Sequence, residues 1–142
     1  MATKREQILA QIKTLLLAAT QTQAGDNVYR ARARPIPKGA ALAINIVPAS
    51  DPPDHFATGA IDWALTVEIQ IHARGDEPDR LADPTVISVH SKLTSDFTLG
   101  GLATGIEPGP VSFEFDDADQ DVGVTTLSYE IRYRTTETDL TQ

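Results

Sequence analysis

The chain has 142 residues, no cysteine, 41% hydrophobic and 23% charged residues, and a formal net charge of −8 at pH 7. A chain of this length can close one core without a disulfide or a metal, and the lack of cysteine excludes disulfide frameworks, thiol catalysis, thiolate zinc sites and iron–sulfur clusters. Its longest apolar run, residues 15–19, falls far short of the ~20 residues of a membrane span, and residues 1–17 lack the order of a secretory signal. We therefore expect a single domain over residues 1–135 that stays where it is made unless a larger assembly carries it away.

Charge is divided unevenly along the chain. Residues 1–38 carry seven basic and two acidic residues, a balance of +5, whereas residues 39–142 carry five basic and eighteen acidic residues, a balance of −13. Segments of opposite sign suggest interaction surfaces. A chain that is acidic over most of its length is a poor candidate for wrapping nucleic acid, because neutralising phosphates requires lysine and arginine.

The first predicted element is a helix that begins after Thr3. Residues 3–6, Thr-Lys-Arg-Glu, match a capping box, in which the Thr3 side chain accepts from the Glu6 amide and the Glu6 side chain returns to the cap. Turn residues at 25–27 end the helical region. The apolar stripe of helical period that should face a core is formed by Ile8, Ile12, Leu15 and Leu16.

Strands are expected next. Residues 28–34 alternate with period 2 until prolines interrupt them, which is typical of a short or edge strand, and residues 41–47 form a second candidate. The stretch 48–59 holds three prolines and is expected to be a loop. From Ile61 to Ala73 apolar and polar residues alternate, which predicts a long antiparallel strand with one covered face.

A second helix is predicted over residues 79–95. Its main part is expected to begin at Asp83-Pro84, because an N-cap residue followed by proline at the first helical position is a common helix start. The side chains expected to point inward are Leu81, Val86, Val89, Leu93 and Phe97.

A hairpin completes the domain after a turn-rich connection. Strands are predicted at 111–115 and 124–135, with a hairpin loop at 116–123 between them and a loose polar tail at 136–142. The element order predicts an α+β fold, in which an antiparallel sheet of four to five strands carries two main helices on one face.

No chemical site is predicted. The three histidines, His55, His72 and His90, lack the spacing of a zinc helix, and no cysteine could complete a metal site. Residues 117–123 superficially resemble a calcium loop, but glycine stands at the seventh place instead of the sixth and Ser128 occupies the position that needs a bidentate glutamate. We therefore expect no catalytic residue, no metal, no cofactor and no enzymatic activity.

Two groups of charged residues are candidates for contacts with another subunit or a partner. A basic row is expected to project from one strand face, and an acidic group from the hairpin tip; the alternative for each is a solvated surface. The basic row consists of Arg30, Arg32 and Arg34. The acidic group consists of Asp116, Asp117, Asp119 and Asp121.

Several local patterns, together with the element order, resemble the tail terminator proteins of long-tailed phages, the family of the lambda minor tail protein U. Residues 60–135 resemble the family well, and the N-terminal part resembles it by element order, beginning with the amphipathic helix. The segments that carry the resemblance are 63–73 (WALTVEIQIHA), 83–93 (DPTVISVHSKL), 98–103 (TLGGLA), 113–121 (FEFDDADQD) and 126–135 (TLSYEIRYRT).

The resemblance implies a structural virion protein. Its subunits would form a hexameric ring on the finished tail tube, end tube polymerisation and offer the surface that joins the tail to the head. The implied partners are further copies of the chain, the tail tube protein and a head–tail connector or neck protein. DNA would pass the lumen without sequence-specific binding, no membrane would be involved, and assembly would take place in the host cytoplasm before the protein resides in the tail or neck of the virion.

Two alternatives remain open at the level of sequence. Another neck protein, such as a head-completion or adaptor subunit, would share the assembly role. A small-ligand or enzymatic module would instead use His72, Glu68 and the loop 116–121 to line a pocket. A deep apolar cleft that holds those groups would favour the enzyme, whereas interfaces on two different sides of a flat subunit would favour the ring.

Overall fold

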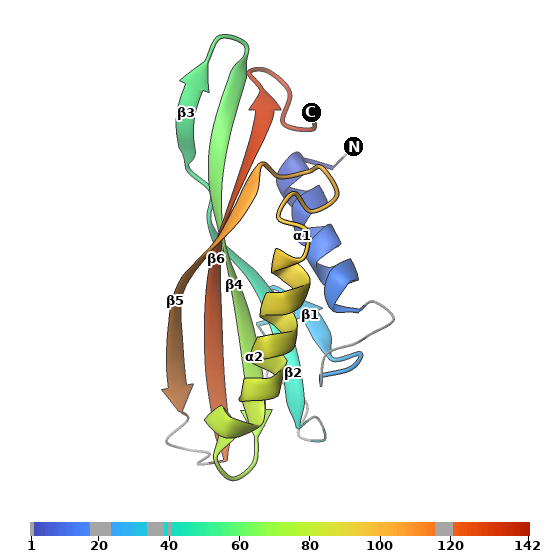
Figure 1. The fold of residues 1–142 in the computed structure, drawn as a ribbon, viewed down its shortest axis with the longest axis vertical. Coiled ribbons are helices and arrows are strands. Elements are labelled where there is room, and N and C mark those ends of the chain that lie inside the picture. The colour runs from blue at the N-terminus through green and yellow to red at the C-terminus, as the bar shows by residue number, and fades with distance from the viewer. Residues whose placement is uncertain (1, 18–23, 34–38, 40, 116–120) are drawn as a thin grey trace.

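The computed structural model describes residues 2–17, 24–33, 39, 41–115 and 121–142, which form two helices and a six-stranded sheet (Figure 1). The elements in chain order are α1 Lys4–Leu16, β1 Val28–Arg30, β2 Leu42–Ser50, β3 Pro53–Ala57, β4 Ala60–Arg74, α2 Pro78–Thr94, β5 Gly105–Phe115 and β6 Val122–Thr136. The strand order is β1-β2-β4-β6-β5, and β3 pairs with β4 beyond the end of β2. The predicted α+β class is confirmed, but the sheet has more strands than expected and is mixed, because β1 runs parallel to β2. No helix in the described part of the chain is long and apolar enough to cross a membrane.

The helix α1 begins where the sequence predicts. The Thr3 hydroxyl accepts from the backbone N–H of Glu6 at 3.2 Å, which satisfies one of the free donors at the helix start. The Glu6 carboxylate does not complete the capping box and instead binds Arg30. The helix ends at Leu16, earlier than the turn at 25–27 that the sequence favoured. Its buried face consists of Ile8, Leu9, Ile12 and Leu16.

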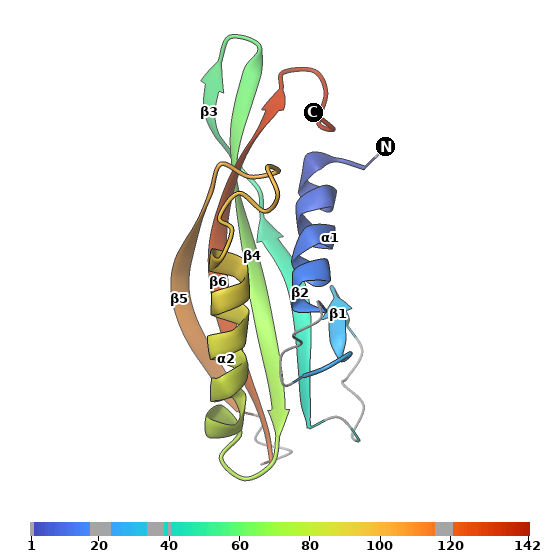
Figure 2. The same cartoon turned by 45° about the vertical axis from the view of Figure 1, so that its right-hand side comes forward.

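The core lies between the helices and one face of the long central strands. Every second residue of β4 from Leu65 to Ala73 is buried, and the same holds for β6 from Gly123 to Thr135. Both helices lie over this face (Figure 2). We call the other side, which neither α1 nor α2 covers, the open face; along β4 it carries Asp62, Thr66, Glu68, Gln70 and His72.

The stretch 48–59 is not the loop that the sequence predicts. It contains the end of β2 and all of β3, which forms a hairpin with the start of β4 and extends beyond the helices at one end of the molecule (Figure 1). All five residues of β3 are exposed, and Phe56 is the most exposed large hydrophobic residue among those described, at 68%. Because neither face of β3 covers the core, its sequence lacks the alternation of apolar and polar residues that would predict a strand.

The helix α2 begins earlier than predicted. It starts at Pro78, so Pro84 lies inside the helix and does not mark its first turn. Of the residues expected inside, Val89 and Leu93 are buried, whereas Leu81 and Phe97 are exposed. The extra turn is possible because Pro78 at the helix start loses no hydrogen bond to its missing N–H.

The strand β5 also begins earlier than predicted, at Gly105 instead of Val111. It passes through Pro108 and Pro110, and its pairing with β6 is irregular between Pro108 and Val111. Prolines are tolerated there because β5 is the outermost strand among the described residues, where donors on its outer side complete no ladder.

The C-terminal residues turn back toward the N-terminus. The backbone N–H of Thr136 donates to the carbonyl of Gln142 at 2.7 Å, and the N–H of Lys4 donates to the carbonyl of Leu140 at 2.8 Å. The second bond satisfies another free donor at the start of α1. The two ends of the chain therefore lie near each other (Figure 1).

Candidate interaction surfaces

Arg30, the first residue of the predicted basic row, binds a carboxylate of its own subunit. Its guanidinium donates two hydrogen bonds to the Glu6 carboxylate, at 2.5 and 2.8 Å. The pair joins β1 to α1 on the helix-covered side of the sheet. Hydrogen bonding and the positive charge of Arg30 lower the pKa of Glu6, and the same bonds raise the pKa of Arg30.

Arg32, the second member of the row, lies on the opposite side of the sheet. The strand β1 ends at Arg30 because Ala31 adopts a left-handed conformation, with φ of 47°. Arg32 then bonds through its backbone to the side chain of Asn45, with its N–H donating to Oδ1 at 3.0 Å and its carbonyl accepting from Nδ2 at 3.1 Å. Its guanidinium lies 4.5 Å from the ring centroid of Tyr29.

The prediction of one basic row on one strand face is therefore wrong for Arg30 and Arg32. The φ angle of Ala31 breaks the alternation that the sequence suggested and sends the two side chains to different sides. Arg34, the third member, lies outside the described residues. A role of these arginines in contacts between subunits stays a prediction, and Arg32 is the member whose guanidinium the structure places on the open face.

Much of the basic charge of the N-terminal segment is compensated within the subunit. Besides the Arg30–Glu6 pair, Arg5 lies 3.4 Å from the Asp51 carboxylate, and the Lys4 ammonium donates to the carbonyl of Arg134 at 3.1 Å. Arg30 and Glu6 both belong to residues 1–38, whereas the Arg5–Asp51 pair joins the two oppositely charged segments. Part of the difference is used to hold α1 against the sheet.

The predicted acidic group is described only at Asp121. Its carbonyl accepts from the backbone N–H of Gly75 at 2.7 Å, which ties the start of β6 to the turn between β4 and α2. That turn adds the exposed carboxylates of Asp76 and Glu77, so this end of the molecule is acidic. Asp116, Asp117 and Asp119 lie outside the described residues, and a contact role for the group stays a prediction.

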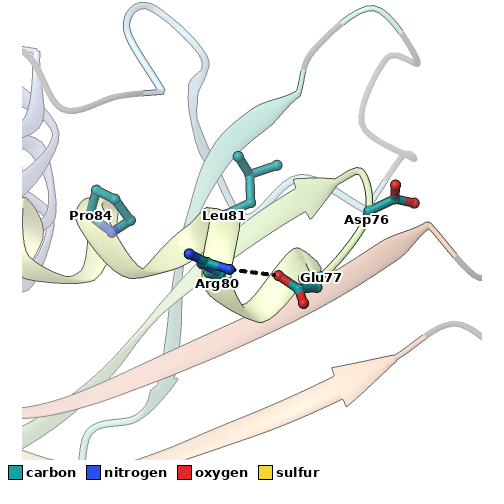
Figure 3. Close-up of a pocket in the computed structure, with 5 residues that line it drawn as sticks. All are labelled: Asp76, Glu77, Arg80, Leu81 and Pro84. Carbon is teal, nitrogen blue, oxygen red and sulfur yellow. Dashed lines mark hydrogen bonds and ion pairs between the residues drawn. The ribbon is translucent and has the colours of Figure 1, made fainter.

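A shallow hollow of about 360 Å³ lies beside the acidic end, around the first turns of α2 (Figure 3). A salt bridge of 3.2 Å between Arg80 and Glu77 crosses its wall. The lining residues are Asp76, Glu77, Arg80, Leu81 and Pro84. None of them is a member of the group that the enzymatic alternative requires, so this hollow does not bring His72 and Glu68 together with the hairpin loop.

The histidines are separated from one another in the fold. His72 lies on the open face, where burial lowers its pKa and its Nε2 atom has no hydrogen-bond partner among the described residues. His90 lies on α2, with Nδ1 3.0 Å from the hydroxyl of Tyr129, and His55 lies opposite Asp62 in the β3–β4 hairpin. Within the described ranges, no group of three or more histidine, aspartate or glutamate side chains is placed to hold a metal ion.

The structure shows one apolar surface that the sequence analysis missed. Three residues of β5 are about half exposed: Val111 at 49%, Phe113 at 58% and Phe115 at 58%. They alternate along the strand, and their partners on β6, Leu127, Thr125 and Gly123, are all buried, so the three side chains lie on the helix-covered side of the sheet. We call these three residues the β5 stripe. The sequence predicted a strand at 111–115, but only the strand order shows that its apolar side chains lie at a sheet edge.

Comparison with known proteins gives a fold and no family. No protein-family model matches the chain, and no curated protein matches its sequence. Among solved structures, the chain is similar to one described as "Virion of native gene transfer agent (GTA) particle", with a TM-score of 0.60 and 13% sequence identity. The similarity covers 89% of this chain and 94% of the other. The two chains share a fold over almost their whole length.

Proposed function

We propose that the protein is a structural subunit of a phage-like particle, in which it caps the tail tube as a ring. The observation that carries the proposal is the shared fold with a chain of the gene transfer agent virion, which extends over nearly all of both chains. The resemblance of residues 60–135 to tail terminator proteins supports the narrower role. A hexamer would end tube polymerisation by covering the last tube ring and would offer the head a new surface.

The shape of the subunit supports a ring component. Its two sheet edges, β1 and β5, lie on different sides, so one copy can contact a neighbour on each side. Its two ends along the strands also differ: the β3–β4 hairpin with Phe56 projects at one end, and the acidic turn with Asp76 and Glu77 lies at the other. A cap needs two such unlike surfaces, since one must bind the tail tube protein and the other a head–tail connector.

The charge of the chain supports a lumen that does not hold DNA. The net charge is −8. On the open face the arginines of β6 are paired with carboxylates, Arg132 with Glu130 at 2.7 Å and Arg134 with Asp62 at 2.6 Å. Carboxylates repel the phosphates of a passing duplex, whereas binding would require a surplus of lysine and arginine.

Deletion of the gene from a particle-producing strain tests the role. We expect particles of the wild type to contain the protein at the junction of tail and head, by mass spectrometry and electron microscopy. The deletion strain should accumulate overlong tubes without heads, because nothing ends their growth. Tubes of normal length without heads would instead indicate a neighbouring neck subunit. Absence of the protein from purified particles, together with normal particles in the deletion strain, would contradict any virion role.

A further inference from the structure

The two edges of the sheet are level with each other. The paired residues can be followed across the sheet from β1 to β5 through every strand between them. One row runs Val28, Ile44, Ile71, Thr125, Phe113, and another runs Arg30, Ile46, Ile69, Leu127, Val111. The three residues of β1 therefore stand at the height of residues 111–113 of β5. A copy that is rotated about an axis along the strands brings β1 beside this part of β5 without a large shift.

The strand directions fit such a contact. β1 is parallel to β2, and each step from β2 to β4, β6 and β5 is antiparallel, so β1 and β5 run in opposite directions. When two copies stand side by side with the same orientation, β5 of one and β1 of the next are antiparallel. Within β1 the backbone groups of Val28 and Arg30 point away from β2, and the Val28 N–H already donates to the carbonyl of Asp26 at 2.8 Å. The antiparallel contact with β5 is therefore short and is centred on the N–H and carbonyl of Arg30.

The helices supply the missing cover for the β5 stripe. α2 packs on β4 and β6, and α1 packs on β1 and β2 (Figure 2). Within one copy Val111 and Phe113 are therefore about half exposed. The bond between Glu6 on α1 and Arg30 on β1 fixes that helix beside its strand. When β1 of a second copy joins β5, its α1 is placed on the same side as the stripe. An exposed apolar edge strand is a liability in a monomer, and this contact removes it.

The charges on the two edges are of opposite sign. β5 holds Glu107 and Glu114 and no basic residue, whereas the other edge holds Arg32. Arg32 lies on the open face, over Tyr29, and Glu107 lies on the same face because its partner on β6 is Glu130. In the contact Arg30 is level with Val111, and the two strands run in opposite directions. Arg32, two residues after Arg30, is therefore level with the residues just before Val111, which brings it near Glu107 of the next copy.

We infer that β5 of one copy pairs with β1 of a second copy, which covers Val111 and Phe113 of the β5 stripe with the neighbour's α1 and brings Arg32 near Glu107. The contact joins two different surfaces, β5 of one copy and β1 of the next. A pair of copies therefore still has one unpaired β1 and one unpaired β5, and further copies can add until a ring closes. The inference rests on the proposed ring for closure, and it adds the surfaces that meet.

The apolar part of the contact is tested with Phe113→Asp and the matched control Phe97→Asp. Phe97 is 60% exposed, close to the 58% of Phe113, but lies in the connection between α2 and β5 and is not part of the β5 stripe. By size-exclusion chromatography with light scattering, wild type and Phe97→Asp should assemble alike. Phe113→Asp should be monomeric, with a dissociation constant raised about 30-fold or more, while its circular dichroism stays that of the wild type.

The polar part is tested by exchanging charges. Arg32→Glu and Glu107→Lys should each raise the dissociation constant about fivefold, and the double variant should recover most of the loss. Full assembly of Phe113→Asp, equal loss in Phe97→Asp, or a wild type that stays monomeric at every concentration would overturn the inference. The proposed function is judged separately, by the protein's presence in particles, so a ring built through other surfaces would refute the edge contact alone.

Discussion

The pair of Arg30 and Glu6 shows how a single residue can be mistaken for an interface residue. Arg30 was expected to face a partner, yet it satisfies a carboxylate of its own subunit with two hydrogen bonds. Reversal of its charge would place two carboxylates together and destabilise the subunit before any ring could form. A test of assembly through the basic segment therefore has to use Arg32 and leave Arg30 unchanged.

Substitution of Arg30 by methionine should produce a pH-dependent loss of stability. The pKa of Glu6 is below its ordinary value of 4.5 in the folded protein, so the pair stabilises the fold above that value. The contribution is lost as the pH falls through the lowered pKa, because Glu6 then becomes protonated. We expect Arg30→Met to reduce the free energy of unfolding by about 0.5–1 kcal/mol at pH 7, measured by urea denaturation.

The same measurement near pH 3 should show a smaller difference between Arg30→Met and wild type. Arg80→Met is the control, because Arg80 also binds a carboxylate, at 3.2 Å, but its side chain is 83% exposed against 27% for Arg30. That variant should differ little from wild type at either pH. A deficit of Arg30→Met that is the same at both pH values would show that packing of the side chain, and not the ion pair, stabilises the fold.

At the scale of elements, Pro84 destabilises α2 locally, because it lies inside the helix. A proline inside a helix removes the hydrogen bond to the carbonyl four residues earlier, here that of Arg80, and its ring crowds the same carbonyl. Pro84 is exposed, so no core contact depends on its ring. Pro84→Ala should raise the free energy of unfolding by about 1–2 kcal/mol, measured by thermal denaturation.

Pro78→Ala provides the comparison in the same helix. Pro78 stands at the helix start, where its ring removes no hydrogen bond, and it is buried beside Gly123, where an added Cβ would come within 2.9 Å of the proline ring. Loss of this packing should lower the stability. If Pro84→Ala proved no more stable than wild type, the ring of Pro84 would have to stabilise the first turns of α2 in a way that its exposure does not suggest.

The elements that could be predicted are those that bury one face. Apolar and polar residues alternate in β4 and β6 because every second side chain enters the core. The start of α1 could be predicted because Thr3, its capping residue, can be recognised in the sequence. β3 and the first half of β5 could not be predicted, because they lie at the margins of the sheet and contain prolines. β3 covers no core, and the first half of β5 reaches the core through Ile106. The candidate surface could not be predicted either, since it depends on the φ angle of Ala31 and on which strands are outermost.

At the scale of the whole molecule, the inferred contact couples assembly to stability. The surfaces that meet, β1 and β5, are complete only in the folded chain, so association binds the folded state and not the unfolded one. Mass action then stabilises the folded state as the concentration of subunits rises. A tenfold higher concentration adds up to about 1.4 kcal/mol. For a chain of this size each kcal/mol shifts the midpoint by roughly 2–4 °C, so Tm should rise by about 3–6 °C.

Calorimetry over a hundredfold range of protein concentration measures this dependence. Wild type and Phe97→Asp should show a Tm that rises with concentration, whereas the Tm of Phe113→Asp should begin to rise only at concentrations about 30-fold higher, since its edge pairs more weakly. At high dilution all three should approach the Tm of the single subunit. A wild-type Tm that is independent of concentration would mean that folded copies do not associate over this range, and the half-exposed phenylalanines of β5 would then not mark a contact between copies.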